Sequence, residues 1–266
     1  VPGVWAQRVF APWHDMAEAM EDKGIDLFSL EEKRPIRDFD VVGFSLLYEL
    51  SYTTVVRMLK LSKIPLHADE RSAHDPIVIA GGTSTVNPAP FASFFDLIVV
   101  GDGEEVVEEM AGVCLRTKDR SERLAAMAEI EGVHRPGSGS PVKRRILRDL
   151  DSCPFPSNNV LPHISIVHDR IGVEAARGCT RGCRFCQAGM IYRPYRERSF
   201  ESVMESLRKG LAATGYDTVA MLALSMTDLS YINTIMESLA CPSREISIGV
   251  PSLRVEGLTE KVADIL

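Results

Sequence analysis

Short apolar runs alternate with amphipathic stretches along the first half of the chain. The runs are rich in valine and isoleucine, end in small or polar residues, and lie at 40–45, 76–82 and 97–103. Such runs are typical of buried parallel strands. A 3.6-residue apolar spacing predicts amphipathic helices at 53–61 and 104–115, and a further helix is expected at 13–23. The alternation predicts an α/β, doubly wound, Rossmann-like sheet, with an additional edge strand near 6–10.

A second series of strand and helix patterns follows a break. Proline, glycine and serine gather between 134 and 163, where they interrupt helices and strands, and a short strand is predicted near 142–147. Beyond the break, strands are predicted at 172–177, 218–224 and 245–250, and helices at 199–213, 229–239 and 259–266. Three such units in series predict the first half of a β/α barrel.

These patterns predict two domains joined by a linker. We assign 1–133 to the Rossmann-like domain, 134–163 to the linker and 164–266 to the barrel. The chain begins with valine, and the barrel pattern stops after three units. We therefore expect a fragment in which part of each domain is missing.

Composition and charge argue against three classes of protein: general nucleic-acid binders, membrane-spanning proteins and disulfide-rich proteins. The 266 residues are 45% hydrophobic and carry a formal charge of −7, which argues against general nucleic-acid binding. The sequence contains no apolar run long enough to span a membrane. Six cysteines, three of them clustered, fit a reducing cytoplasm better than a disulfide framework.

The clustered cysteines are Cys179, Cys183 and Cys186, spaced as CxxxCxxC. Thiolates hold iron–sulfur clusters, and three of them occupy three corners of a 4Fe–4S cube and leave one iron open. The alternative is a zinc site with a distant fourth ligand, but zinc sites usually pair their cysteines as CxxC. The remaining cysteines, Cys114, Cys153 and Cys241, are too scattered to form a second pair.

The stretch of sequence that contains the three clustered cysteines is also rich in arginine. Between 177 and 198 there are six of them and a single acid, Glu197. The pattern is equally compatible with a solvated face and with a basic rim. Such a rim would balance a cluster's negative charge and receive carboxylates or phosphates.

The run from Val173 to Cys186 resembles the cluster loop of the radical S-adenosylmethionine (SAM) superfamily. The resemblance implies that the open iron chelates the amino and carboxylate groups of SAM. Reductive cleavage of SAM would then give a 5′-deoxyadenosyl radical. The resemblance also places Phe185 beside the adenine, although the residue could simply pack the loop.

A closer resemblance is to bacterial radical SAM proteins with an N-terminal cobalamin-binding-like domain. It rests on stretches of both halves, at 41–50, 79–82, 101–105, 167–170 and 187–194. It implies cobalamin as a possible cofactor, lined by residues at the strand ends: Ser45, Gly81, Gly82 and Gly101. None of the six histidines fits the Asp-x-His-x-x-Gly motif that supplies the lower axial ligand. Glycines at strand ends also serve as ordinary turn residues.

The resemblance further implies a SAM-binding edge after the second and third barrel strands. Where radical SAM enzymes often carry a Gly-Gly-Glu-like segment, this chain has 224–228, in which Ser225, Thr227 and Asp228 can accept hydrogen bonds from an ammonium. We favour Asp228 as the N-cap of the next helix, a role compatible with SAM binding. Ser252 and Arg254 follow the third strand, where they are expected to contact the ribose or carboxylate, unless Arg254 is a plain surface residue.

These features predict a radical SAM enzyme that acts on an unidentified substrate, alkylating it if cobalamin is bound. It would take electrons from a donor such as flavodoxin or ferredoxin. The alternative is a non-catalytic iron–sulfur protein for electron transfer or sensing. Such a protein would normally supply a fourth ligand, which the spacing does not show.

Overall fold

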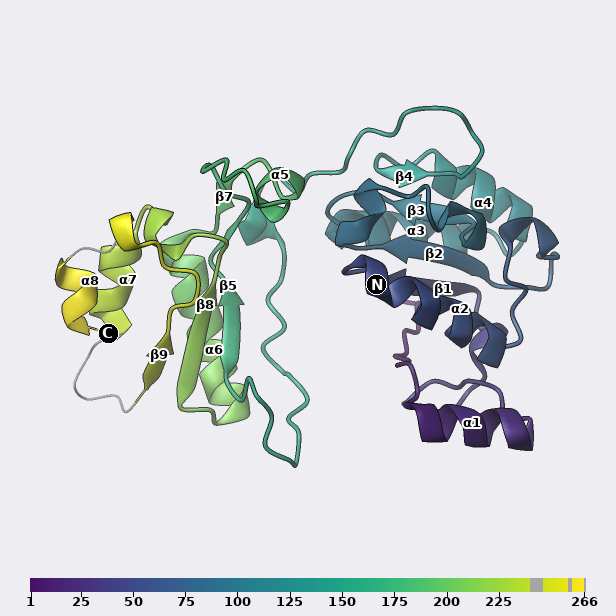
Figure 1. Ribbon diagram of the computed structural model, residues 1–266, viewed down its shortest axis with the longest axis horizontal. Coiled ribbons are helices and arrows are strands. Elements are labelled where there is room, and N and C mark those ends of the chain that lie inside the picture. The colour runs from purple at the N-terminus through teal and green to yellow at the C-terminus, as the bar shows by residue number, and fades with distance from the viewer. Residues whose placement is uncertain (240–245, 258–259, 266) are drawn as a thin grey trace. The chain divides into compact units, whose positions relative to one another are not determined.

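The computed structural model describes residues 1–239, 246–257 and 260–265. The chain divides into two compact units, Val1–Leu147 and Arg148–Leu266 (Figure 1). The division falls inside the stretch 134–163 that we assign to a linker. The assignment of 1–133 and 164–266 to two named domains remains a prediction.

The first unit is built on a four-stranded sheet. Its strands, in the spatial order of the sheet, are β1 (Val41–Ser45), β2 (Ile77–Gly81), β3 (Leu97–Val99) and β4 (Val133–His134). β1, β2 and β3 are parallel, and the short β4 pairs antiparallel with β3. Ser45 is in register with Gly81, so the carboxyl ends of the first two strands meet at one edge.

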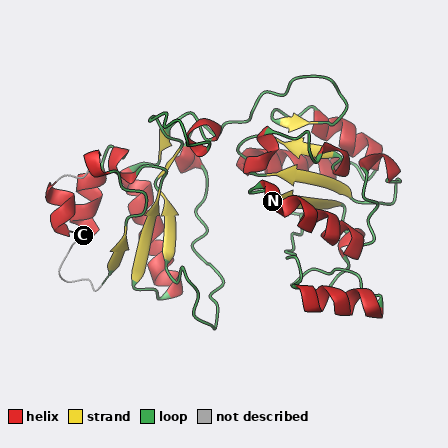
Figure 2. Cartoon of the chain, viewed as in Figure 1, coloured by secondary structure: helices red, strands yellow, loops and turns green. Residues whose placement is uncertain are grey.

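Helices cover both faces of this sheet, as in a doubly wound fold. α2 (Tyr52–Leu61) lies on one face, and α3 (Glu104–Arg116) and α4 (Arg120–Ala128) lie on the other, whereas α1 (His14–Lys23) contacts α2 (Figure 2). Val78 and Ala80 of β2 pack in the core cluster that contains α2, whereas Ile77 and Ile79 pack in the cluster that contains α3 and α4. Because alternate residues serve opposite faces and both faces are buried, the strand reads as a continuous apolar run.

Two sequence predictions for the first unit need correction, and one helix has no counterpart among the predictions. The stretch 6–10 is not a strand, because its one backbone bond to the neighbouring segment, from Leu30 N–H to the Arg8 carbonyl, makes no ladder. The stretch 142–147 forms only an isolated bridge between Gly101 and Arg145. Helix α4 was not predicted, although Asp119 caps it by accepting the Glu122 N–H.

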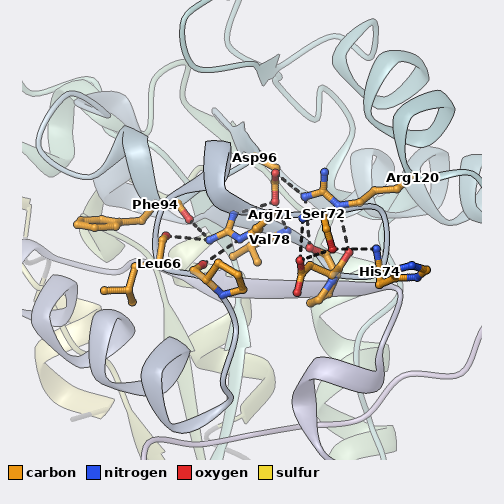
Figure 3. Close-up of polar contacts among 11 residues, drawn as sticks. Leu66, Arg71, Ser72, His74, Val78, Phe94, Asp96 and Arg120 are labelled. Atoms are coloured by element: carbon orange, nitrogen blue, oxygen red, sulfur yellow. Dashed lines mark hydrogen bonds and ion pairs between the residues drawn. The ribbon is translucent and has the colours of Figure 1, made fainter.

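A buried ionic network fixes the loops around β2 and β3 (Figure 3). The Arg71 side chain is 0% exposed, and its Nη1 lies 2.9 Å from Oδ2 of Asp96, which is 4% exposed. Arg71 also donates to three backbone carbonyls, those of Pro65, Leu66 and Phe94. Asp96 accepts the Val78 N–H at 2.8 Å and the Arg120 guanidinium at 2.6 Å. The two guanidiniums of this network, those of Arg71 and Arg120, therefore each pair with one oxygen of the Asp96 carboxylate.

The second unit contains a three-stranded parallel sheet in the order β5–β8–β9. The strands of this sheet are β5 (Ile171–Glu174), β8 (Thr218–Leu222) and β9 (Ser247–Gly249), and β6 (Ala176–Arg177) and β7 (Arg196–Glu197) form a separate two-stranded sheet. The helices of this unit are α5 (Ala188–Ile191), α6 (Phe200–Thr214), α7 (Ile232–Leu239) and α8 (Glu260–Ile265). Ser199 caps α6 by accepting the Ser202 N–H. Buried side chains of β5, β8, α6 and α7 form its core.

The predicted strand at 172–177 is interrupted. The Ala175 N–H still bonds the Leu222 carbonyl at 2.9 Å, but β6 then leaves β8 and pairs antiparallel with β7. The predicted third strand and third helix correspond to β9 and α8, and parts of both predictions lie outside the described residues.

In the described part of the chain, no helix has the length and apolar character needed to cross a membrane.

Candidate functional site

A β-hairpin presents the cysteine motif at the carboxyl end of β5. β6 and β7 pair through Arg177 with Arg196, so the intervening stretch 178–195 forms their connecting loop. Gly178 has φ +90°, and a Cβ on it would lie 2.7 Å from the Tyr192 carbonyl oxygen. Only glycine therefore closes this loop without displacing backbone.

All three motif cysteines are free thiols, and each sulfur accepts a hydrogen bond. The Arg181 N–H reaches Cys179 Sγ at 3.4 Å. The Gly189 N–H reaches Cys186 Sγ at 3.4 Å. The third sulfur, of Cys183, lies 3.6 Å from Nη1 of Arg254. Donors around sulfur stabilise thiolates and tune the clusters that thiolates hold.

The described residues include no group of three or more His, Cys, Asp or Glu side chains converging on a single metal ion. A zinc site needs four ligands around one point. A 4Fe–4S cube instead takes each thiolate on a different iron, so its ligands need not meet at one point. Three thiolate donors suit a cube with one open iron by their chemistry, and their assignment as its ligands remains a prediction.

An ion pair fastens the cysteine loop to the end of β8. Arg181, between the first two cysteines, donates from Nε to Oδ2 of Asp228 at 2.8 Å and from Nη2 to Oδ1. The Asp228 side chain is 13% exposed. The Arg181 guanidinium holds the pKa of the Asp228 carboxyl below its usual value, so Asp228 stays charged.

Asp228 does not cap the helix that follows, contrary to our prediction. It ends the short 3₁₀ helix η7 (Met226–Asp228), whereas α7 begins only at Ile232. Its carboxylate is directed to Arg181 instead of to the first turn of α7.

The segment after β9 docks on the same 3₁₀ helix. The Met226 N–H bonds the Ser252 carbonyl at 3.2 Å, and the Arg254 N–H lies 3.4 Å from Thr227 Oγ1. Ser252 has φ +63°, a left-handed conformation that is costly for a residue other than glycine. The structure thus brings Thr227, Asp228, Ser252 and Arg254 to one edge with the cysteine loop.

Two other predicted SAM-binding residues behave differently from this group. Ser225 is 3% exposed, and its hydroxyl makes no well-formed hydrogen bond among the described residues. The hydroxyl nevertheless lies close enough to the Asp228 carboxylate to help lower the pKa of Asp228. Phe185 is 91% exposed, so the structure does not use it to pack the loop. Its proposed contact with adenine remains a prediction.

A polar cluster that we did not predict from the sequence lies next to the backbone carbonyl of Asp228. The Tyr195 hydroxyl donates to Glu197 at 2.6 Å and lies 3.3 Å from the Asp228 carbonyl. Glu197 also accepts the Ser230 N–H at 2.9 Å and the Ser230 hydroxyl. Burial and then Glu197 raise the pKa of Tyr195, which keeps its proton as a donor. The close spacing of Tyr195 and Glu197 is the only signal of this cluster in the sequence.

The six arginines of the stretch differ in exposure: Arg181, Arg184 and Arg193 are exposed, whereas Arg196 and Arg198 are buried. Arg177 is paired with Glu174, and Arg181 with Asp228. Arg196 and Arg198 are buried and donate to backbone carbonyls, including Pro194 at 3.1 Å and Cys153 at 3.2 Å. The buried guanidiniums of Arg196 and Arg198 therefore hold segments of this unit together, and the basic rim stays a prediction.

We expect Asp228→Asn to loosen the cysteine loop. Losing the charge of Asp228 leaves Arg181 without its carboxylate partner, so the opening equilibrium of the loop should rise several-fold. Iron should therefore leave the reconstituted protein that much faster under a chelator. The control, Glu205→Gln, removes the same charge from an exposed pair with Arg208 on α6. The reversed pair Arg181→Asp with Asp228→Arg should restore much of the retention, and equal iron release from Asp228→Asn and wild type would contradict the fastening role.

At the carboxyl edge of the first unit, the predicted cobalamin residues fall into two kinds. Gly82 (φ +100°) faces the Leu46 carbonyl oxygen, 2.7 Å from where its Cβ would lie. Gly101 (φ +115°) is likewise pressed against the backbone of Arg145. Both glycines are thus explained by internal packing. Ser45 is exposed, and no atom lies within 4 Å of a Cβ built on Gly81, so these two positions are open.

Because Gly82 is packed against backbone and Gly81 is not, we expect alanine at these two neighbouring positions to change the free energy of unfolding by different amounts. Gly82→Ala should lower the free energy of unfolding of the first unit by about 1–3 kcal/mol, because alanine is strained at positive φ and meets backbone. Gly81→Ala has open space and ordinary strand geometry, so it should change that free energy by less than about 0.5 kcal/mol. Urea denaturation measures both, and equal losses would show that Leu46 yields to the added methyl.

Two family models match the chain. The model described as Radical SAM proteins, N-terminal, matches residues 1–136, and the model described as Radical SAM superfamily matches residues 173–266. An uncharacterized protein of Methanocaldococcus jannaschii is 28% identical over 247 residues, covering 92% of this chain and 51% of that protein. The chain therefore spans about half the length of this relative.

Solved structures show the same fold. The radical S-adenosylmethionine methyltransferase TsrM of Kitasatospora setae, with tryptophan substrate and the SAM analogue aza-SAM bound, matches with a TM-score of 0.58 at 14% identity. A second TsrM structure, with cobalamin and a 4Fe–4S cluster bound, matches with a TM-score of 0.56 at 15% identity. Each match covers 95% of this chain and 49% of TsrM. They confirm the predicted α/β fold class, a partial Rossmann-like sheet followed by part of a barrel.

Proposed function

Because the chain belongs to the radical SAM proteins, a family whose cofactors are a 4Fe–4S cluster and SAM, we propose that it is the cofactor-binding part of a radical SAM enzyme. Cys179, Cys183 and Cys186 would hold the cluster. The observation that carries the proposal is the arrangement of these three free thiols. They share one hairpin loop, and each sulfur has its own N–H donor.

When bound, the cluster supplies the electron that cleaves SAM to a 5′-deoxyadenosyl radical. The chain's own residues would bind and orient SAM. The Ser225 hydroxyl, buried and without a well-formed hydrogen bond, suits the ammonium better than Asp228, whose carboxylate is already held by Arg181. Phe185 would contact adenine, and Thr227 and Ser252 line the same edge.

Cobalamin is the second cofactor that we propose, at the carboxyl edge of β1 and β2. Ser45 and Gly81 are open there, and the loop after β1 exposes the apolar side chains of Leu47 (68%), Tyr48 (56%) and Leu50 (76%). We propose that cobalamin covers these exposed apolar groups, since contiguous apolar surface is one mark of a ligand-binding groove. In the described loops after β1, β2 and β3 there is no histidine, so these loops offer cobalamin no lower axial imidazole.

Substrate turnover would need an electron donor such as flavodoxin or ferredoxin. The first test is therefore independent of both the natural donor and the substrate. Protein reconstituted anaerobically with iron and sulfide, given SAM and a strong chemical reductant, should release 5′-deoxyadenosine. Protein that retains its cluster and releases none would favour the electron-transfer alternative. Addition of hydroxocobalamin tests the second cofactor, and Gly81→Trp should block its retention on gel filtration.

A further inference from the structure

Arg254 is held between the SAM-binding edge and one cysteine sulfur. Its backbone N–H lies 3.4 Å from Thr227 Oγ1, which fixes the start of the side chain. Its Nη1 lies 3.6 Å from Cys183 Sγ, and its Nη2 lies 3.4 Å from Glu256. Both terminal nitrogens are thus occupied within the protein. We had expected this side chain to contact SAM.

The three cysteines differ in the charge of their donors. Cys179 and Cys186 accept neutral backbone N–H groups, whereas Cys183 accepts a guanidinium that carries a full positive charge. Hydrogen bonds with an ionised donor or acceptor are about twice as strong as neutral ones. Among the three described sulfurs, Cys183 is therefore the one whose hydrogen-bond donor is itself a cation, since the nearby Arg181 guanidinium bonds Asp228 instead of Cys179.

We infer that Arg254 is a positioning residue that donates a charge-assisted hydrogen bond to the ligating Cys183 thiolate and makes the cluster easier to reduce. The inference rests on the proposed function. Three thiolates on a cube of formal charge 2+ give a net charge of −1, and one added electron makes it −2. A nearby cation stabilises the more negative, reduced form, so the midpoint potential rises.

Redox titration of the reconstituted protein, monitored by the electron paramagnetic resonance of the reduced cluster, tests this role. One electron from dithionite or titanium(III) citrate reduces each cluster. We expect Arg254→Gln to reduce the ratio of reduced to oxidised cluster about tenfold at a fixed potential. For a one-electron couple this is a shift of about −59 mV.

The chain offers a matched control in Arg184, which lies between Cys183 and Cys186. It is exposed, and in the described residues it forms no hydrogen bond or ion pair. Arg184→Gln removes the same charge from the same loop without removing a donor to sulfur. Its shift should be less than half that of Arg254→Gln, because solvent screens an exposed charge.

Arg254→Lys keeps the charge but not the guanidinium geometry, so its potential should lie between those of wild type and Arg254→Gln. An unchanged potential in Arg254→Gln, or an equal shift in Arg184→Gln, would overturn the inference. So would loss of the cluster from both Arg254 variants while they remain folded, because Arg254 would then hold the loop instead of tuning it. Wild-type protein that takes up no cluster would instead refute the proposed function itself.

Discussion

Replacing Cys179, Cys183 and Cys186 together with alanine is expected to remove all cluster-bound iron. Wild-type protein reconstituted under anaerobic conditions should bind roughly four irons per chain and show the brown absorbance of an iron–sulfur protein. Each thiolate holds a different iron, so loss of all three leaves the cube without protein ligands. Iron analysis and visible absorbance measure the result directly.

The matched controls are serine replacements at Cys114 and Cys153, which should leave the iron content unchanged. Burial raises the pKa of the Cys114 thiol, so this thiol stays protonated and is a poor ligand. Cys153 lies in the stretch that packs on Arg198. Cys241, which we also predict not to be a ligand, lies outside the described residues. Equal iron in the triple variant and in wild type would contradict the assignment.

Asp96→Asn is expected to cost about 3–5 kcal/mol of unfolding free energy, because it leaves a buried guanidinium without its counterion. Arg71 has no exposed side-chain surface, so water cannot replace the lost carboxylate. Urea denaturation monitored by circular dichroism measures the loss in the first unit. The large effect would establish that this network stabilises the sheet that carries the proposed cobalamin edge.

Glu31→Gln is the matched control. It removes one carboxylate from a pair with Arg8 whose side chains are 35% and 58% exposed. Exposed pairs contribute roughly 0–1 kcal/mol. If Asp96→Asn and Glu31→Gln lower the free energy of unfolding by the same small amount, the buried network would stabilise the first unit no more than an exposed ion pair does.

The strand β2 could be predicted because burial on both of its faces leaves a continuous apolar run in the sequence. The stretch 76–82 corresponds to β2, and the stretch 40–45 corresponds to β1, an edge strand in which only Val42 is buried. The cysteine loop was equally accessible, since the spacing of its thiols is local. α4 also has a local signal, Asp119 followed by Glu122 at the N-terminus, which we overlooked.

The contacts that organise the site could not be predicted in the same way. Arg181 and Asp228 lie 47 positions apart, and only the fold of the second unit makes Asp228 a partner of Arg181 instead of a helix cap. Gly82 and Gly101 were interpreted as cofactor-lining residues because each follows a strand. Their positive φ angles and the backbone pressed against them became evident only from the structure.

The most direct test of a three-cysteine cluster with an iron open to SAM is the paramagnetic resonance spectrum of the reduced, reconstituted protein, recorded with and without SAM. If SAM chelates the open iron, its addition should shift the spectrum of the reduced cluster. An identical spectrum at saturating SAM, with four irons per chain confirmed by analysis, would contradict the central claim.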